Sequence, residues 1–449
     1  MITGKHLIWP IVLAWIGAAS QAAAVDEFVP LFNGRDLSGW VNVNCAPDTF
    51  SARDGIIVCT GQPTGVMRTE RQYENFVLEL EWMHLHERGN AGLFVWSGPL
   101  PVTGQPFTRS IEVQILDGRN SETYTSHGDV FAIQGATMKP DRPHPLGSMR
   151  CLPSEQRCHP AGQWNHYRVT CQNGVIKLAV NGKVVSGGYD CNPQKGYICL
   201  ESEGSDVHFR NIRLQELPPG DPPGDRVAQK DRGFQAMFDG LSLAGWKRHT
   251  ALEGRWDVHR GVIRLANDQS PRKRGQDYDL WTEKSYQDFV LIADWRLTKK
   301  PELQEMNDFT ADGLIKTDAN GARVTHQILN AGDSGVYLRG NSRSQVNIWS
   351  QPMGSGDINS YHKDAKLPLE IRQACVPSVK ADNPPGQWNR FEITALGDRV
   401  TVVLNGTVVI EDAQLPDIPA SGPIALQNHA DGIEFRNLYI RELTGEARR

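Results

Sequence analysis

The 449-residue chain lacks an apolar run long enough to cross a bilayer as a helix, and the apolar run near its start is too short as well, so we expect no membrane insertion. It also lacks a long run of Lys or Arg. The net charge is -5, and a short basic cluster at 272–274 is typical of a solvated loop, so nucleic acid is not an expected partner. Long helical patterns are absent too, which favours a chain built from strands.

The first 24 residues predict an export signal. Lys5 gives a basic start, residues 7–18 form a short apolar run, and residues 21–24 supply the small side chains of a signal-peptidase site. We expect cleavage after Ala24 and a mature protein that is periplasmic or secreted. No Cys follows this site, so no lipid anchor is expected there.

Cysteine is scarce in the second half of the chain, because seven of the eight cysteines lie in the first half. Their spacings fit no zinc pattern, and export leads to an oxidising compartment, so disulfides are the favoured interpretation. Seven is an odd number, so one thiol of the first half is left over or pairs with Cys375. The connectivity does not follow from the sequence.

The most informative feature present is an internal repeat, since six segments recur in the same order. The pairs are 31–40 and 237–246, 76–82 and 289–295, 91–95 and 334–338, 162–165 and 386–389, 181–182 and 405–406, and 209–211 and 435–437. A repeat of this length is a domain rather than a solenoid unit. We therefore predict domains at 25–217 and 231–449, joined by a stiff Pro/Gly-rich linker at 218–230.

Both units have the hydrophobic periodicity of β-strands. Residues 76–83 alternate with period two, which predicts one buried face and one partly polar face. Residues 175–185 predict a hairpin with Asn-Gly at its turn, where both residues take positive φ, and residues 400–410 repeat it. Many strands and Gly-rich turns in each unit predict an all-β fold of two-sheet, jelly-roll sandwiches.

These segments together resemble the 3-keto-disaccharide hydrolase domain family, formerly a domain of unknown function. Its opening Leu-Phe-Asn-Gly-x-Asp-Leu-x-Gly-Trp matches residues 31–40, and its Glu-x-Gln-Ile-Leu-Asp matches residues 112–117. The resemblance covers nearly the whole mature chain, once per unit. It implies two tandem concanavalin A-like sandwiches. It also implies cleavage of glycosides whose sugar carries a ketone at carbon 3, by elimination followed by hydration.

Such chemistry needs a base for the proton on carbon 2, an acid for the leaving oxygen, and an electrophile or cation for the enolate. Residues 111–115 alternate, so Glu112 and Gln114 point to one polar face. Glu79 and Glu81 occupy the polar face of another strand. If the two strands are neighbours, several carboxylates meet on one open sheet face.

For the first domain we predict catalytic roles for Glu112, Asp117, His127 and Glu203, and substrate contacts for Gln114 and Glu81. A divalent cation is a candidate cofactor, and carbohydrate is the expected partner. Each assignment has a structural alternative. Alternating Glu residues are commonly solvent-exposed, and Asp117 could cap a turn. We expect His84 and His86 at the surface, and Trp164 and Trp388 in the core.

The second domain departs from the pattern. Gln345, Asn347 and Ser350 stand where the first domain has Glu112, Gln114 and Asp117. The polar and aromatic side chains that remain suit a sugar-binding cleft, because an aromatic face stacks on the C–H bonds of a pyranose. We predict substrate contacts for Arg339, Asn347, Trp349 and His429, in a binding module or a second active site.

Two other functions remain open at this stage. The chain could be a lectin-like protein that holds polysaccharide without cleaving it. It could also hydrolyse an unoxidised glycosidic bond between two flanking carboxylates, whose separation would then indicate retention or inversion.

Overall fold

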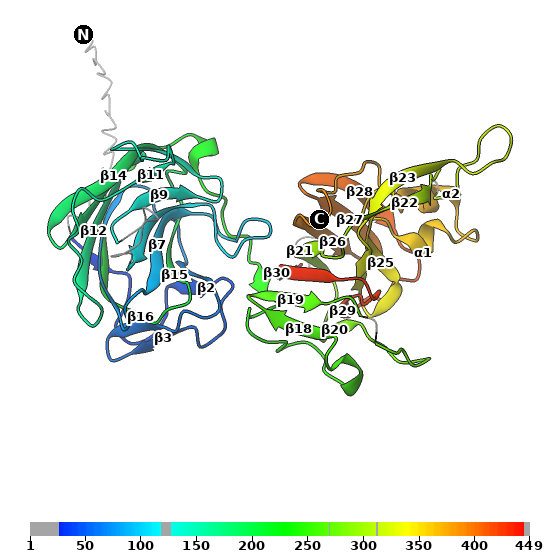
Figure 1. Cartoon of the computed structure of the whole chain (residues 1–449), viewed down its shortest axis with the longest axis horizontal. Coiled ribbons are helices and arrows are strands. Elements are labelled where there is room, and N and C mark those ends of the chain that lie inside the picture. Colours follow the sequence, from blue (N-terminus) through cyan, green and yellow to red (C-terminus); the bar gives the residue numbers. More distant parts are fainter. Residues whose placement is uncertain (1–26, 118–126, 269, 311–312, 444–449) are drawn as a thin grey trace, which may run out of the picture.

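A computed structural model describes residues 27–117, 127–268, 270–310 and 313–443. Its elements are almost all strands, arranged as two sandwiches that lie side by side (Figure 1), so the predicted all-β fold is confirmed. The predicted export signal and its cleavage site lie outside the described residues. Within the described ranges, no helix is both long enough and apolar enough to span a membrane.

The first sandwich consists of a 9-stranded and a 7-stranded antiparallel sheet. The larger sheet has the order β10 (Thr137–Pro140), β14 (Lys183–Asn192), β13 (Val175–Val180), β12 (Asn165–Gln172), β6 (Phe76–His84), β16 (Val207–Glu216), β4 (Ile56–Cys59) and β3 (Phe50–Arg53), with β1 (Val29–Pro30) on β16. The smaller sheet has the order β11 (Arg150–Cys151), β9 (Val130–Ile133), β8 (Ser110–Leu116), β7 (Asn90–Ser97), β15 (Tyr197–Ser202), β5 (Gly65–Thr69) and β2 (Trp40–Asn42).

The second sandwich repeats this plan with an 8-stranded and a 4-stranded sheet. The larger sheet has the order β18 (Trp256–His259), β19 (Val262–Leu265), β30 (Ile433–Glu442), β21 (Phe289–Leu297), β26 (Asn389–Leu396), β27 (Arg399–Leu404) and β28 (Thr407–Gln414), with β17 (Gln235–Ala236) on β30. The smaller sheet has the order β20 (Leu280–Tyr286), β29 (Gly422–Leu426), β24 (Asp333–Leu338) and β25 (Asn341–Trp349).

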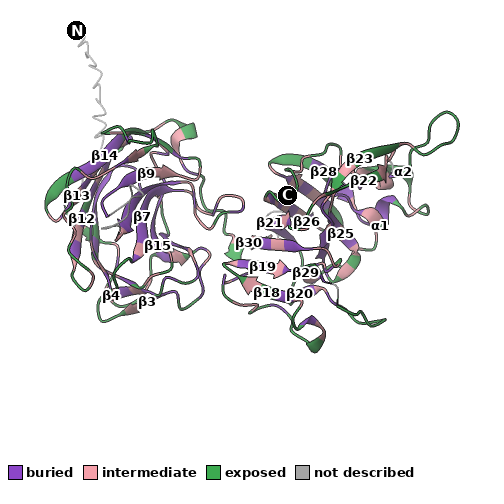
Figure 2. Cartoon of the chain, in the orientation of Figure 1, coloured by how far each residue is buried: buried purple, intermediate pink, exposed green. Residues whose placement is uncertain are grey.

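The remaining elements are short. A separate two-stranded hairpin consists of β22 (Glu302–Asn307) and β23 (Thr325–Asn330). The helical turns are η1 (Gly224–Arg226), η2 (Thr250–Leu252), α1 (Asn359–His362) and α2 (Leu369–Ala374). Figure 2 shows the sandwich strands mostly buried, whereas the tip of the β22–β23 hairpin is exposed.

In strand β6, the alternating apolar residues of the sequence are buried. Phe76, Leu78, Leu80 and Trp82 are each at most 1% exposed and lie in the core between the two sheets of the first sandwich. The predicted alternation of this strand is therefore confirmed. The predicted hairpin between β13 and β14 is confirmed as well, because Asn181 and Gly182 have φ values of 44° and 87°.

A loop between β7 and β8 ties the two sandwiches together. The Gly104 N–H donates to Asp294 Oδ2 over 2.8 Å, and Arg436 Nη1 donates to the Gly104 carbonyl over 3.0 Å. Arg390 Nη2 donates to the Pro101 carbonyl over 2.9 Å and also pairs with Asp294, which is fully buried. The loop is thereby fixed against the 8-stranded sheet of the second sandwich.

The Pro/Gly-rich linker packs along the first sandwich. Its Asp221 N–H donates to Glu74 Oε1 over 3.0 Å, and the Ala228 N–H donates to the Lys195 carbonyl over 2.8 Å. The stiffness of this segment therefore comes from contacts with the first sandwich as well as from its prolines.

Three expectations about buried residues are not met. All eight cysteines lie in the described ranges, and no disulfide joins any of them; most fill the cores as small apolar side chains. His84, expected at the surface, is 2% exposed. Trp164 and Trp388, expected in the core, are partly exposed and lie under the guanidinium groups of Arg210 and Arg296.

Candidate functional site

Three glutamates meet on the outer face of the 7-stranded sheet. Glu112 lies on β8 between the core residues Ile111 and Val113, so the pleat turns its side chain away from the core. Glu201 lies on β15, and Glu203 follows that strand directly. The strand between them is β7, so residues from three neighbouring strands form the site.

Gly92 on β7 creates the space in which these carboxyl groups converge. A Cβ atom at this position would lie 2.5 Å from Glu201 Oε2 and 3.0 Å from Glu112 Oε1. Any larger residue would push the two carboxyl groups apart. The glycine therefore allows two acidic side chains from different strands to approach each other closely.

The carboxyl groups hold their protons tightly. Burial, reinforced by the charge of Glu203, raises the pKa of Glu112 to about 8. Burial and then the charges of Glu112 and Glu203 raise the pKa of Glu201 well above its usual value. Burial also raises the pKa of Glu203, against a hydrogen bond from Asn90 that favours its charged form. All three pKa values are therefore shifted toward the protonated form, and the value of about 8 leaves Glu112 mostly protonated at neutral pH.

Amide side chains orient one edge of the cluster. Asn90 Nδ2 donates to Glu203 Oε2, and Gln114 Nε2 donates to Asn90 Oδ1 over 3.0 Å. Glu201 Oε2 is buried, and no described group forms a hydrogen bond with it. A buried carboxyl oxygen without a partner is unusual in a folded protein and is typical of a site that receives a ligand.

The second sandwich borders this site. Phe94 lies opposite Glu112 on the neighbouring strand and packs edge-to-face on Phe107 at 5.7 Å. It also belongs to an apolar cluster that includes Ile292 and Tyr439 of the second sandwich. One side of the glutamate cluster is therefore covered by apolar side chains, whereas Asn90 and Glu203 on its other side are partly exposed.

The structure brings some of the predicted residues together and adds others. Glu112 and Glu203, both predicted to be catalytic, lie close together, and Gln114 lies beside them. Glu201 was not assigned to the site, although its alternation with Ile198 and Leu200 on β15 places it on the polar face. Asn90, which donates to Glu203, was not assigned to the site either.

Three predicted residues of the first domain lie elsewhere. Asp117 accepts the Arg88 N–H over 3.1 Å beyond the end of β8, which is the turn-capping alternative. His127 packs on Trp82, with ring centroids 4.8 Å apart, and therefore lies at the core side of the sheet. Glu81 lies on β6 in the other sheet, where Arg210 Nε donates to it over 2.7 Å.

The reason for the Glu81 error is topological. Strands β6 and β8 are not neighbours, so their polar faces are on opposite sides of the sandwich. Glu79 on the same strand is paired with Arg168 and Arg213, and these partners lower its pKa despite its burial. Both glutamates stabilise the outer face of the 9-stranded sheet.

The second sandwich keeps the same geometry with different chemistry. Gln345 Nε2 donates to Gln427 Oε1 over 2.7 Å, and a Cβ at Gly335 would lie 2.3 Å from Gln345 Nε2. Two amides therefore replace the two carboxyl groups around an equivalent glycine. Burial raises the pKa of Asp333 to about 6, against the charge of the exposed His429.

Among the substrate contacts predicted for the second domain, two residues are buried and paired inside the protein. Arg339 is 1% exposed and pairs with Asp288 over 2.9 Å inside the sandwich. Asn347 is 3% exposed and donates to Asp357 Oδ2 over 3.1 Å. Trp349 and His429 remain accessible at the smaller sheet. In the described ranges, no group of three His, Cys, Asp or Glu side chains is arranged to hold a metal ion.

The chain is similar to several known proteins. A 3-keto-disaccharide hydrolase of Bacteroides thetaiotaomicron is 22% identical over 242 residues, which cover 43% of this chain and 79% of the relative. A protein of Parabacteroides distasonis, named as a candidate glycosyl hydrolase, is 23% identical with a TM-score of 0.34, over 42% of this chain and 94% of that one. The carbohydrate-binding module CBM66 of Bacillus subtilis is 12% identical with a TM-score of 0.26, over 40% and 96%.

The family assignment rests on a match to both sandwiches. Residues 27–215 and again 233–441 match the 3-keto-alpha-glucoside-1,2-lyase-like domain. Because these two segments span nearly all of the described chain, the protein belongs to the 3-keto-alpha-glucoside-1,2-lyase-like family and contains two copies of its domain.

Proposed function

We propose that the first sandwich is an enzyme that cleaves 3-keto-glycosides by elimination followed by hydration. The observation that carries this proposal is the group of three glutamates around Gly92, in which burial raises every pKa. Family membership and the name of the Bacteroides relative support a carbohydrate hydrolase-like function. Groups with strongly raised pKa values in one site are typical of acid–base catalysts.

The elimination needs one ionised and one protonated carboxyl group. The base removes the proton on carbon 2, the electrons form the C1–C2 double bond, and the C1–O bond breaks. The acid gives its proton to the departing oxygen. Water then adds its oxygen to carbon 1 and a proton to carbon 2, which yields the free 3-keto sugar and restores both carboxyl groups.

The environments of the three glutamates favour different roles. Glu203 is the least buried and accepts a hydrogen bond from Asn90, so it serves as the base. Glu112, with a pKa of about 8, is protonated at neutral pH and serves as the acid. Glu201 stays neutral and donates a hydrogen bond to the ketone oxygen, where negative charge develops in the enolate.

We also propose that the protein is exported. The basic start, apolar run and small residues at the N-terminus predict delivery to the periplasm or the exterior. A 3-keto-glycoside would then be cleaved outside the cytoplasm, and the enzyme that oxidises carbon 3 would have to act before this one.

The test is release of 4-nitrophenol from both anomers of 4-nitrophenyl 3-keto-glucoside and from the unoxidised parents. The chain from residue 25 would be assayed with and without chelator, beside Glu112→Gln. Glu81→Gln is the matched control, because it makes the same chemical change on the opposite sheet. We expect release only from the keto substrates, lost in Glu112→Gln and kept in Glu81→Gln.

Three other results would change or extend the proposed function. Release from the unoxidised parents would replace elimination by ordinary glycoside hydrolysis. Equal activity in Glu112→Gln would remove the site from the first sandwich. Loss of activity with chelator would establish that a divalent cation takes part.

A further inference from the structure

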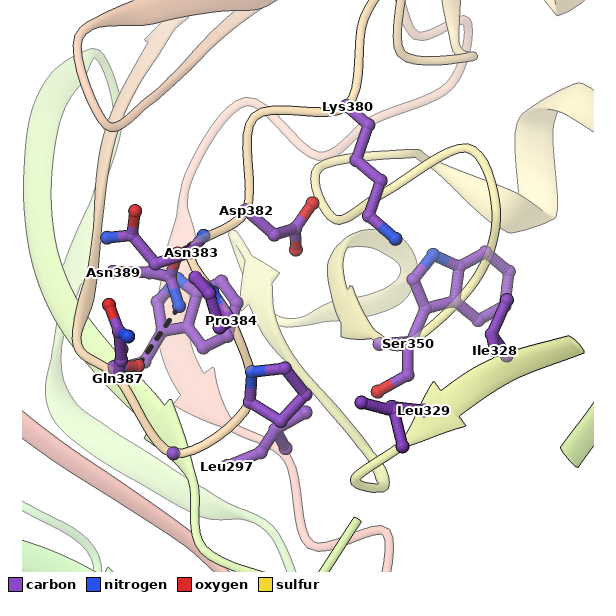
Figure 3. A pocket seen from close by; sticks show the side chains of 14 residues that line it. Leu297, Ile328, Leu329, Ser350, Lys380, Asp382, Asn383, Pro384, Gln387 and Asn389 are labelled. Atoms are coloured by element: carbon purple, nitrogen blue, oxygen red, sulfur yellow. Dashed lines mark hydrogen bonds between the residues drawn. The ribbon is translucent and has the colours of Figure 1, made fainter. Parts of the chain in front are cut away.

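The second sandwich contains a pocket of about 320 Å³ at the end of β25 (Figure 3). Trp349, Ile328 and Leu329 line one side of it, and the loop at 380–387 lines the other. In Figure 3, the side chains of Lys380 and Asp382 extend from that loop toward the same region of the pocket. This volume lies at the lower end of the range for ligand pockets in proteins.

The hairpin that forms one wall of the pocket has no counterpart among the described residues of the first sandwich. There, β6 ends at His84 and β7 begins at Asn90, so only a short turn connects them. In the second sandwich, the equivalent connection spans residues 298–332 and forms the β22–β23 hairpin. Since Ile328 and Leu329 belong to this hairpin, the insertion itself builds one wall of the pocket.

The aromatic wall is also specific to the second sandwich. Trp349 pairs in register with Asp333, just as Leu116 pairs with Asn90 in the first sandwich. A leucine therefore stands where the second sandwich has an indole. The Trp349 Nε1–H donates to the Gly354 carbonyl over 2.9 Å, so the ring is held in one orientation while the side chain stays partly exposed.

The polar groups at the rim are held in place as well. Both oxygens of Asp382 accept the Ser355 N–H, over 3.2 and 3.0 Å. Lys380 Nζ donates to the Gln351 carbonyl over 3.3 Å. Because the rim carries one positive and one negative side chain, it favours neither an anionic nor a cationic ligand.

We propose that this pocket binds a single neutral pyranose ring. A pyranose has an apolar face of C–H bonds, which suits Trp349 and Leu329, and a rim of hydroxyl groups, which suits Asp382 and Lys380. A wholly apolar ligand would leave these charged groups desolvated without new partners. This pocket is separate from the glutamate cluster, and sugar binding there does not require cleavage at the cluster. The second sandwich would therefore bind carbohydrate independently of the first.

The test measures binding of the methyl glycosides of glucose, galactose, mannose and xylose by saturation-transfer NMR and titration. We expect at least one to bind, and Trp349→Ala to weaken that binding about tenfold or more. Trp349→Phe, which keeps a ring, should retain most of the affinity. Trp281→Ala removes an aromatic residue of the smaller sheet outside the pocket and is the matched control, expected to bind like the unaltered chain.

A second variant guards against loss of folding in Trp349→Ala. Leu329 is 52% exposed on the hairpin, so Leu329→Arg should fold normally and still block the pocket. Binding retained in both variants, binding lost only in Trp281→Ala, or no binding of any of the four glycosides would overturn the proposal. Glu112→Gln should bind these sugars normally, so failure of the proposed cleavage would leave this result unaffected.

Discussion

The raised pKa of Glu112 makes the stability of the first sandwich depend on pH. A carboxyl group whose pKa is higher in the folded state stabilises the fold most when it is protonated. That contribution is complete when the pH is below the pKa of Glu112 in the unfolded chain, near 4.5. It is lost as the pH rises through the pKa in the folded chain, about 8. The two values imply a loss of at most about 5 kcal/mol over this interval.

Glu112→Gln should abolish most of this dependence, because the amide keeps the shape and has no proton to lose. We expect the variant to melt near the unaltered chain at pH 5 and clearly above it at pH 8, while lacking activity. Melting of the first-sandwich transition would be followed by calorimetry between pH 5 and pH 8.5.

The control is Glu81→Gln, because Glu81 has a lowered pKa: burial raises it, but Asn211 and Arg210 outweigh that effect. The melting temperature of Glu81→Gln should therefore depend on pH in this range as strongly as that of the unaltered chain. The melting temperatures of Glu112→Gln and the unaltered chain could instead change in parallel from pH 5 to pH 8. Glu112 would then not be buried in its protonated form, and the reasoning would fail.

Three more predictions follow from individual contacts. Gly92→Ala should fold but lose about a hundredfold in kcat/KM, because its Cβ would displace both carboxyl groups, and a normal kcat/KM would refute the crowding argument. Asp294→Ala should leave Arg390 without its carboxylate partner at a cost of up to about 3–5 kcal/mol and expose the loop at 98–109 to proteolysis; an unchanged digestion pattern would contradict this. Arg339→Met should lower the melting temperature of the second sandwich without altering sugar binding, and weaker binding by the folded variant would restore a ligand-contact role.

Much of the architecture followed from local patterns. Alternation in residues 76–83 and the Asn-Gly turn at 181–182 depend on the pleat and on backbone sterics, which act between near neighbours in the chain. The repeat revealed two domains for a similar reason, because the same local patterns recur in the same order. Glu112 was identified because its strand shows both the alternation and the motif.

Other properties were decided only by long-range packing. Alternation shows which side of its own strand a residue occupies, but not which sheet the strand joins, so Glu81 was assigned to the wrong face. Arg339 looked like a ligand contact until its pairing with Asp288 buried it. Likewise, the approach of Glu201 to Glu112 over Gly92, and the pocket beside Trp349, exist only because strands and an inserted hairpin distant in sequence meet in space. The sequence by itself determined the strands, the duplication and one acidic residue, whereas pKa values and pockets required the tertiary structure, since both depend on what surrounds a group after folding.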